Sequence, residues 1–365
     1  MPTALSLINQ AYEEGWEELD LSGMELTELP PEIGKLRNIQ ELNLSSNQLQ
    51  DIPDTIENLV GLVSLDLSTN NIVHMPSSIA SLTYLKTLIL HTNEIFYVPH
   101  FIANLTTLKN LYLGSNNIIS IPASITNLTT LNDLDLSYND IDYIPDEISN
   151  LVNLTSVDLC GLPINSLPSS ITNLTKLQEL YLSNTYIDCL PESIGNLLDV
   201  RDLNLSKNNI KSIPDSIGEL INLKELNLGY NRIQHIPETI SGLVSLRVLY
   251  IENNNIRYIP ETIGELKKLE TLMLYNNKIS YIPNSVGGMT SLKYLNISNN
   301  YLTGIPDSIG DLFNLQVLHL SNNQIMEIPQ SIGTLSNLKN IDLTRNRLVH
   351  IPNSILNNEN MTFHI

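Results

Sequence analysis

Apolar residues recur along the chain with a period of 23 residues, and proline marks this period most clearly. Fifteen of the eighteen prolines keep the spacing, from Pro30 to Pro352. When each repeat begins fourteen residues before its proline, the shared unit is L-x-x-L-x-L-x-x-N-x-I-x-x-I-P-x-x-I-x-x-L-x-x. Self-similarity at one fixed period indicates an array of structural repeats rather than a series of unrelated domains.

Each repeat is predicted to form one short strand and one tight return. Positions four and six, Leu42 and Leu44 in the second repeat, are two residues apart, so both side chains point to one face of a strand. The proline at position fifteen ends strand hydrogen bonding, and the apolar positions eighteen and twenty-one have the spacing of a helical turn. Stacked coils bury together an apolar side that no single coil can bury alone. The sequence therefore predicts an α/β solenoid with a concave parallel sheet and short 3-10, helical or irregular convex segments.

The segment before the first repeat, residues 1–15, is predicted to be a capping helix. Thr3 is a suitable N-cap, and Gly15 is a suitable C-terminal stop. Leu5, Ile8 and Tyr12 are placed on one face of this helix. That face is expected to cover the open apolar edge of the first coil.

The repeats are assigned to residues 16–358, and residues 359–365 to a truncated sixteenth repeat or C-terminal cap. Asn358 replaces the apolar residue of position twenty-one, and Met361 and Phe363 begin the unfinished repeat. A loose C-terminal edge would be able to pair end to end with a second molecule, because its backbone groups lack partners.

Asn at position nine suits a buried turn, because an amide side chain both donates and accepts hydrogen bonds. Twelve of the fifteen repeats have Asn there, whereas the seventh has Leu162 and the eighth has Thr185. Pro163 removes a further donor beside Leu162. Local irregularity is therefore predicted over residues 154–199. This departure is either a functional hinge or notch, or drift that a long redundant array tolerates.

These repeats resemble the leucine-rich repeat, and the form I-P-x-x-I-G-x-L at residues 213–220 is similar to its Ras-group subclass. The opening segment at residues 11–23 also resembles the start of such arrays. Similar repeats occur in intracellular Ras-binding scaffolds and before the GTPase domains of Roc-COR proteins. The resemblance spans about residues 16–358. It implies a horseshoe with a protein-binding surface, and a small GTPase or a signalling enzyme as partner.

The net charge of −20 argues against a nucleic acid or an anionic membrane as partner, because both favour a basic face. Two cysteines do not make a disulfide scaffold, and Cys160 and Cys189 are expected to be free thiols. The N-terminal segment has no signal-peptide pattern, and no apolar run reaches about 18 residues. We therefore expect a soluble cytoplasmic protein.

The sequence contains no phosphate-binding, dinucleotide-binding or zinc-protease motif. A row of carboxylates is predicted on the open face, without an accompanying nucleophile: Asp133, Asp135, Asp158, Glu179 and Asp202. An exposed sheet does not exclude water from an acid/base pair, and a strand row spreads oxygens that a cation needs to converge. We therefore expect no enzymatic activity, cofactor or metal, with a weak cation site as the open alternative.

The concave positions three, five and seven comprise forty-five sites, of which twelve are acidic and none is Lys or Arg. Together with positions eight and ten, these positions hold nine of the fifteen tyrosines. Tyrosine offers a large rigid contact area with a polar tip and is enriched at binding hot spots. A tyrosine ladder that merely stiffens the sheet is the alternative.

We interpret this face as the binding site of a non-catalytic interaction module for a protein with a basic and apolar surface. Its predicted contact residues are Tyr230, Val248, Tyr250, Met273, Tyr275, Tyr294, Val317, His319, Asp133, Asp135, Asp158 and Asp202. One alternative is an exported effector or adhesin that uses the same face. The other is a structural spacer that assembles through its ends.

Overall fold

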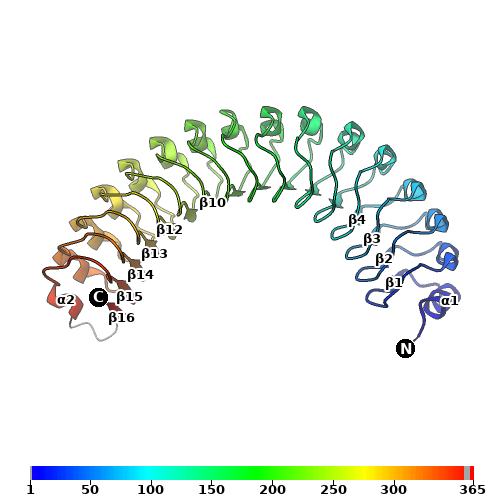
Figure 1. The fold of residues 1–365 in the computed structure, drawn as a ribbon, viewed down its shortest axis with the longest axis horizontal. Helices are drawn as coiled ribbons and strands as arrows, with labels where there is room; N and C mark the ends of the chain where they lie inside the picture. The colour runs from blue at the N-terminus through cyan, green and yellow to red at the C-terminus, as the bar shows by residue number, and fades with distance from the viewer. Residues whose placement is uncertain (1, 357–361) are drawn as a thin grey trace. The chain divides into compact units, whose positions relative to one another are not determined.

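The computed structural model describes residues 2–356 and 362–365. The chain divides into two compact units, Met1–Leu177 and Gln178–Ile365. Both units are built from the predicted coil, which consists of one three-residue strand and one short 3-10 segment. Within each unit, the strands line the inner, concave side of the curve and the 3-10 segments line its outer side (Figure 1).

The first unit begins with a helix and continues with seven coils, each a strand followed by a 3-10 segment. Its elements are α1 (Ala4–Glu14), β1 (Glu18–Asp20), η1 (Pro31–Lys35), β2 (Glu41–Asn43), η2 (Asp54–Asn58), β3 (Ser64–Asp66), η3 (Ser77–Ser81), β4 (Thr87–Ile89), η4 (His100–Asn104), β5 (Asn110–Tyr112), η5 (Ala123–Asn127), β6 (Asp133–Asp135), η6 (Asp146–Asn150), β7 (Ser156–Asp158) and η7 (Ser169–Asn173).

The second unit repeats the same alternation. Its elements are β8 (Glu179–Tyr181), η8 (Ile194–Asn196), β9 (Asp202–Asn204), η9 (Asp215–Glu219), β10 (Glu225–Asn227), η10 (Glu238–Gly242), β11 (Val248–Tyr250), η11 (Glu261–Glu265), β12 (Thr271–Met273), η12 (Asn284–Gly288), β13 (Tyr294–Asn296), η13 (Asp307–Asp311), β14 (Val317–His319), η14 (Gln330–Thr334), β15 (Asn340–Asp342), α2 (Asn353–Leu356) and β16 (Thr362–His364).

Strands within a unit pair in parallel and in chain order, each shifted by one repeat from its neighbour. Leu226 of β10, for example, lies opposite Leu249 of β11, which lies opposite Leu272 of β12. All three side chains are buried in the core, whereas the residues on either side of them face outward. Fully burying one such leucine stabilises the fold by about 1.5–3 kcal/mol. The predicted parallel sheet and its register are confirmed.

Asn recurs at position nine of the repeats because its side chain connects neighbouring coils, as Asn231 illustrates. Its Nδ2 donates to the carbonyl of Leu205 in the preceding coil at 2.9 Å and to the carbonyl of Leu228 in its own coil at 3.0 Å. Its Oδ1 accepts the amide of Ile210 at 3.0 Å. The side chain is buried and therefore supplies hydrogen bonds that water cannot supply. The predicted role of this asparagine is confirmed.

Position eight precedes this asparagine and takes the left-handed backbone conformation. Asn253, Asn276 and Asn299 have φ between 53° and 54° there, whereas Tyr138 has φ 51° and Tyr230 has φ 58°. Asn tolerates this conformation, but a bulky residue with positive φ is uncommon and strained. Two of the tyrosines counted on the face thus occupy an unfavourable backbone position.

Helix α1 forms as predicted, with a different buried face. The Thr3 side chain accepts the Ser6 amide, and Gly15 adopts φ 69° at the C-cap. The prediction that Leu5, Ile8 and Tyr12 share the buried face was wrong, since Leu5 and Tyr12 are exposed. The buried residues are Ala4, Ile8 and Ala11, because a close approach to the first coil favours small side chains on either side of Ile8.

The predicted irregularity of repeats seven and eight is slight. In repeat seven, Leu162 is fully buried and its amide makes a 3.4 Å hydrogen bond to the Leu159 carbonyl, while β7 and η7 keep their usual lengths. In repeat eight, η8 shrinks to three residues, and Thr185 replaces the amide with a hydroxyl that contacts Asn208. The leucine and the threonine are therefore accommodated without loss of a strand.

At the C-terminal end, β16 extends the sheet beside β15, with Phe363 opposite Ile341. Asn358 and Met361, which the sequence analysis assigned to the end of the array, lie outside the described residues. Neither cysteine forms a disulfide; Cys160 is buried and Cys189 is exposed.

Candidate functional site

Strands β10 to β14 of the second unit present two rows of half-buried side chains on the concave side. In the position-three row, Val248, Thr271, Tyr294 and Val317 lie in direct register. Neighbouring strands lie about 4.8 Å apart, so each side chain is adjacent to the next. Valine or tyrosine thus occupies this row on three of the four strands, and Thr271 separates Val248 from Tyr294.

The position-five row runs beside the first. Tyr250, Met273, Asn296 and His319 are in register along β11 to β14. All four are partly accessible to solvent. The structure thus brings together six of the predicted contact residues: Val248, Tyr250, Met273, Tyr294, Val317 and His319.

Aromatic contacts connect these rows. The rings of Tyr294 and His319 meet edge to face with centroids 5.5 Å apart, and the Tyr294 hydroxyl lies 3.2 Å from His319 Nδ1. Tyr275 and Tyr230 share a side-chain hydrogen bond. Burial, followed by this hydrogen bond, raises the pKa of Tyr275 to about 12. Tyr230, which lies in the turn after β10 rather than on a strand, is therefore tied to the same surface.

Glu252 is buried beneath this surface, although the sequence analysis counted it among the exposed carboxylates. Glu252 is only 9% exposed. Its carboxylate lies over Gly229, because a Cβ added to this glycine would be 2.6 Å from Glu252 Oε1. Among the described residues, its Oε2 has no hydrogen-bond partner. Burial raises the pKa of Glu252, and its charge contributes to the raised pKa values of Tyr250 and Tyr275. The glycine one repeat earlier, at the same position, is the sequence signal that this carboxylate folds back.

A triplet of carboxylates occupies position three on β8, β9 and β10. Asp202 lies in register with Glu179 on one side and with Glu225 on the other. Burial, then Glu225, then Glu179 raise the pKa of Asp202 from 3.8 to about 6, against a lowering hydrogen bond from Tyr181. Three acidic side chains on adjacent strands disfavour full ionisation and favour an incoming cation.

The remaining predicted acids lie in the first unit and have internal partners. The Tyr112 hydroxyl donates to Asp133 Oδ2 at 2.7 Å; burial and this bond raise the pKa of Tyr112 to about 12. Asp135 and Asp158 face each other in register on β6 and β7. Burial raises the pKa of Asp158, and its proximity to Asp135 adds to this effect.

The position-five carboxylates of the first unit also have a structural role that the sequence analysis missed. Asp135 Oδ1 accepts the Ser137 amide, and Asp158 Oδ1 accepts the Cys160 amide, both at 2.8 Å. Asn or Asp makes the same turn in other repeats, as Asn204 does with the Ser206 amide. Asp or Asn at position five, at the end of the strand, is the sequence signal for this side-chain hydrogen bond to the amide of position seven.

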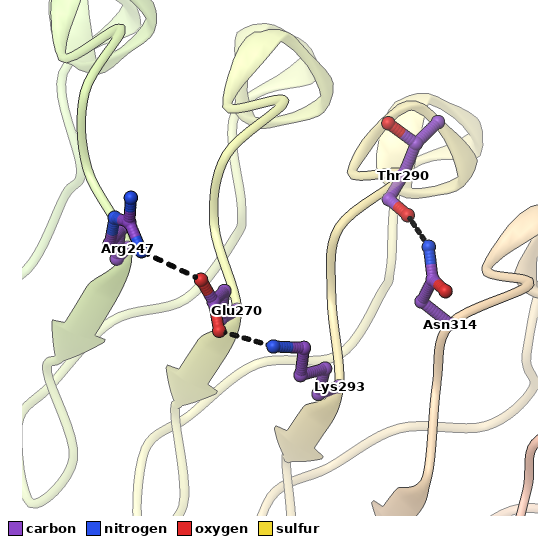
Figure 2. Close-up of polar contacts among 5 residues, drawn as sticks. All are labelled: Arg247, Glu270, Thr290, Lys293 and Asn314. Atoms are coloured by element: carbon purple, nitrogen blue, oxygen red, sulfur yellow. Dashed lines mark hydrogen bonds and ion pairs between the residues drawn. The ribbon is translucent and has the colours of Figure 1, made fainter.

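Basic residues on the rim at position two are partly neutralised by one acidic neighbour. Glu270 Oε1 lies 3.3 Å from Arg247 Nη1, and its Oε2 lies 2.6 Å from Lys293 Nζ (Figure 2). On the same side of the coils, Asn314 Nδ2 donates to the Thr290 carbonyl at 2.8 Å. These exposed pairs contribute little to stability, but they keep the positive charges beside the strands rather than over them.

A further concave hollow of about 480 Å³ lies over β1 to β4 in the first unit. Its acidic lining residues are Glu18, Asp20, Glu41 and Asp66, and Ile89 contributes an apolar wall. These carboxylates belong to the twelve acidic concave positions, but the sequence pattern predicts no site there. No group of three or more metal-ligating side chains converges within the described part of the chain, and no described helix has the length and apolar character needed to cross a bilayer.

Comparisons with known proteins agree with this architecture. Models of the leucine-rich repeat region match residues 55–140, 123–198, 170–249, 187–281 and 284–362, and a leucine-rich repeat model matches residues 16–72. No curated protein matches the chain in sequence.

Among solved structures, a leucine-rich repeat protein of Leptospira interrogans is 31% identical with a TM-score of 0.88, and the match covers 98% of each chain. The plant peptide hormone receptor RGFR1 in complex with RGF2 is 31% identical with a TM-score of 0.72, over 95% of this chain and 66% of the receptor chain. An internalin of Listeria monocytogenes is 29% identical with a TM-score of 0.73, over 84% and 88% of the two chains. The 23-residue coil, its asparagine ladder and these matches together place the chain in the leucine-rich repeat family.

Proposed function

We propose that this chain is a non-catalytic protein-interaction module whose main contact surface is the concave side of β10 to β14. The observation that carries the proposal is the continuous surface formed by Val248, Tyr250, Met273, Tyr294 and Val317 on adjacent strands. A tyrosine ladder that only stiffens the sheet does not need the half-buried methionine and valines beside it. Clustered apolar and aromatic side chains of this kind are typical of protein-binding hot spots.

The charge of the face favours a basic partner. Burial and then the neighbouring carboxylates of Glu225 and Glu179 raise the pKa of Asp202. A Lys or Arg side chain from a partner would relieve this repulsion and accelerate encounter through long-range attraction. The proposal also includes Asp133, Asp135 and Asp158 as a separate acidic surface of the first unit, where their remaining acceptor capacity faces the open side of the sheet.

We also propose a class of partner and a cellular location for this chain, and both rest on the sequence resemblance. Similarity to Ras-group repeats favours a small GTPase or a signalling enzyme in the cytoplasm. A second candidate is an exported effector or adhesin, for which the similarity to an internalin of Listeria monocytogenes is the specific observation. Tracking the tagged full chain in cell and medium fractions of its native host separates these two candidates.

The concave face is tested by capture of partners from the native lysate with two matched triple variants. The test variant carries Tyr250→Asp, Tyr275→Asp and Tyr294→Asp, and the control variant carries Ile221→Asp, Val244→Asp and Phe313→Asp. The control residues are also large, apolar or aromatic, but they are exposed after the 3-10 segments. We expect the test variant to lose partners that the wild type and the control variant both retain. The melting temperatures of the three proteins should agree, so that the loss reflects a missing contact rather than unfolding.

Equal capture by all three proteins would contradict the proposal. If capture is equal and light scattering also shows concentration-dependent filaments, the chain is instead a spacer that assembles through its ends. Loss of capture by the control variant alone would move the contact surface to the convex side.

A further inference from the structure

A hollow in the second unit lies away from the strand face, where the segment between β13 and η13 runs beside the segment between β14 and η14. Its volume is about 660 Å³, and an adjoining hollow of about 280 Å³ shares Thr303, Gly304, Ile305 and Pro306 with it. Both volumes together are in the size range of small-ligand and side-chain pockets. The hollow therefore forms a groove that passes over Gly304.

The groove exists because the large side chains that fill position thirteen in repeats ten to twelve are replaced by glycine in repeat thirteen. In repeats ten, eleven and twelve this position is His235, Tyr258 and Tyr281, and the rings of His235 and Tyr258 pack with centroids 5.2 Å apart. The next repeat has Gly304, where an added Cβ would meet nothing within 4 Å. The column of rings thus ends at an open space.

The missing side chain exposes apolar surface that is covered in the preceding repeat. Ile282, which follows Tyr281, is 1% exposed, whereas Ile305, which follows Gly304, is only half-buried. Tyr281 lines one part of the groove and Met326 another, and each is 51% exposed. An uncovered core position between two exposed large side chains is suited to receive an apolar anchor from another molecule.

The carboxylates that line the groove indicate which charge a bound group should carry beside the apolar anchor. Asp307 and Glu327 line the larger hollow, and its lining residues include no Lys, Arg or His. Neither carboxylate takes part in an ion pair among the described residues. A cationic group beside the apolar anchor would therefore meet uncompensated negative charge.

We propose that this groove, defined by Gly304, Ile305, Tyr281, Met326 and the carboxylates of Asp307 and Glu327, binds a peptide segment that inserts an aromatic side chain flanked by Lys or Arg. The anchor side chain rests on Ile305 between Tyr281 and Met326, and the flanking cation faces Asp307 or Glu327. This second surface is separate from the concave face, so the proposal does not depend on the function proposed above.

Methyl NMR of the full chain, labelled at isoleucine and methionine methyls, tests the groove directly. The probe is acetyl-Lys-Trp-Lys-amide, with acetyl-Glu-Trp-Glu-amide and acetyl-Lys-Ala-Lys-amide as matched controls. We expect saturable shifts of the Ile305 and Met326 methyls with the Lys-Trp-Lys peptide, and at least tenfold weaker binding of both controls. Absence of these shifts, or equal binding of the Glu-Trp-Glu peptide, would overturn the proposal.

Two variants identify the groove as the site. Gly304→Tyr continues the ring column without a positive φ or a close contact, so its melting temperature is expected to be no lower than that of the wild type. It should weaken the Lys-Trp-Lys peptide at least tenfold, whereas Ser212→Tyr, at the same position of repeat nine, should leave binding unchanged. Met326→Lys alters only an exposed side chain and should also weaken binding. Retained affinity in both Gly304→Tyr and Met326→Lys would contradict the assignment.

The concave face supplies the remaining control. The triple variant with Tyr250→Asp, Tyr275→Asp and Tyr294→Asp should bind the Lys-Trp-Lys peptide as the wild type does. Loss of peptide binding in this variant would place the peptide on the strands and remove the groove as a separate site.

Discussion

Replacing Asp202 with Asn is expected to stabilise the fold at neutral pH while weakening a basic partner. Asp202 is half-buried between Glu179 and Glu225, and its pKa is raised from 3.8 to about 6. Above pH 6 the folded protein therefore holds a carboxylate whose ionisation is less favourable than in the unfolded chain. Asn has nearly the same shape as the protonated acid and carries no charge.

The magnitude follows from the two pKa values. At about 1.36 kcal/mol per pH unit, the difference between 3.8 and about 6 corresponds to roughly 3 kcal/mol as an upper bound. Solvent screens this half-buried group, so we expect about 1–1.5 kcal/mol. Because the folded pKa of Asp202 is raised, its unfavourable contribution is present above pH 6. It fades as the pH falls toward 4, where the folded protein binds a proton before the unfolded chain does.

The assay is urea unfolding of the wild type and of Asp202→Asn at several pH values between 4 and 8. Asp215→Asn is the control, since it removes the same formal charge from an exposed residue of η9. We expect Asp202→Asn to have the higher midpoint at pH 7.5 and the advantage to shrink toward pH 4. A lower midpoint for Asp202→Asn at pH 7.5, or an advantage that is independent of pH, would refute the reasoning.

Three further substitutions test other parts of the structure by urea unfolding. Asn231→Ala leaves the Ile210 amide and two buried carbonyls without their partner, so we expect the free energy of unfolding to fall by about 3–5 kcal/mol. The control, Gln234→Ala at an exposed residue, should change it by less than about 0.5 kcal/mol. A similar loss in both variants would contradict the role of the asparagine ladder. Tyr230→Asn relieves a strained backbone with φ 58° and should add about 0.5–1 kcal/mol while weakening partner capture; reduced stability would show that the Tyr275 contact outweighs the strain. Leu249→Ala empties a fully buried strand position and should cost about 2–5 kcal/mol, and a cost under about 1 kcal/mol would mean that the coils repack around the gap.

The fold was predictable because the same coil pattern recurs in fifteen repeats. Proline at position fifteen and leucine at positions four and six define the strand, its end and its register, and Leu226 opposite Leu249 follows directly from the period. The asparagine ladder was also predictable, since an amide side chain can satisfy both the donors and the acceptors of the buried turn.

The features that the sequence analysis missed depend on a single neighbour in the next coil. Glu252 occupies a position assigned to the open face, yet the absence of a side chain at Gly229 lets its carboxylate fold down and become buried. The Ile305 groove likewise arises where Gly304 interrupts a column of larger residues. In the N-terminal helix, packing distance rather than hydrophobicity selected Ala4 and Ala11 over Leu5 and Tyr12 for the buried face. Such effects lie between repeats and do not appear in the pattern of one repeat.

Photo-crosslinking tests most directly whether the strand face of the second unit is where partners bind. One full-length protein carries p-benzoylphenylalanine in place of Tyr250 on β11, and the other carries it in place of Phe313, which is exposed after η13. After irradiation in the native lysate, we expect discrete crosslinked products from position 250 and none from position 313. Products from position 313 alone would contradict this expectation.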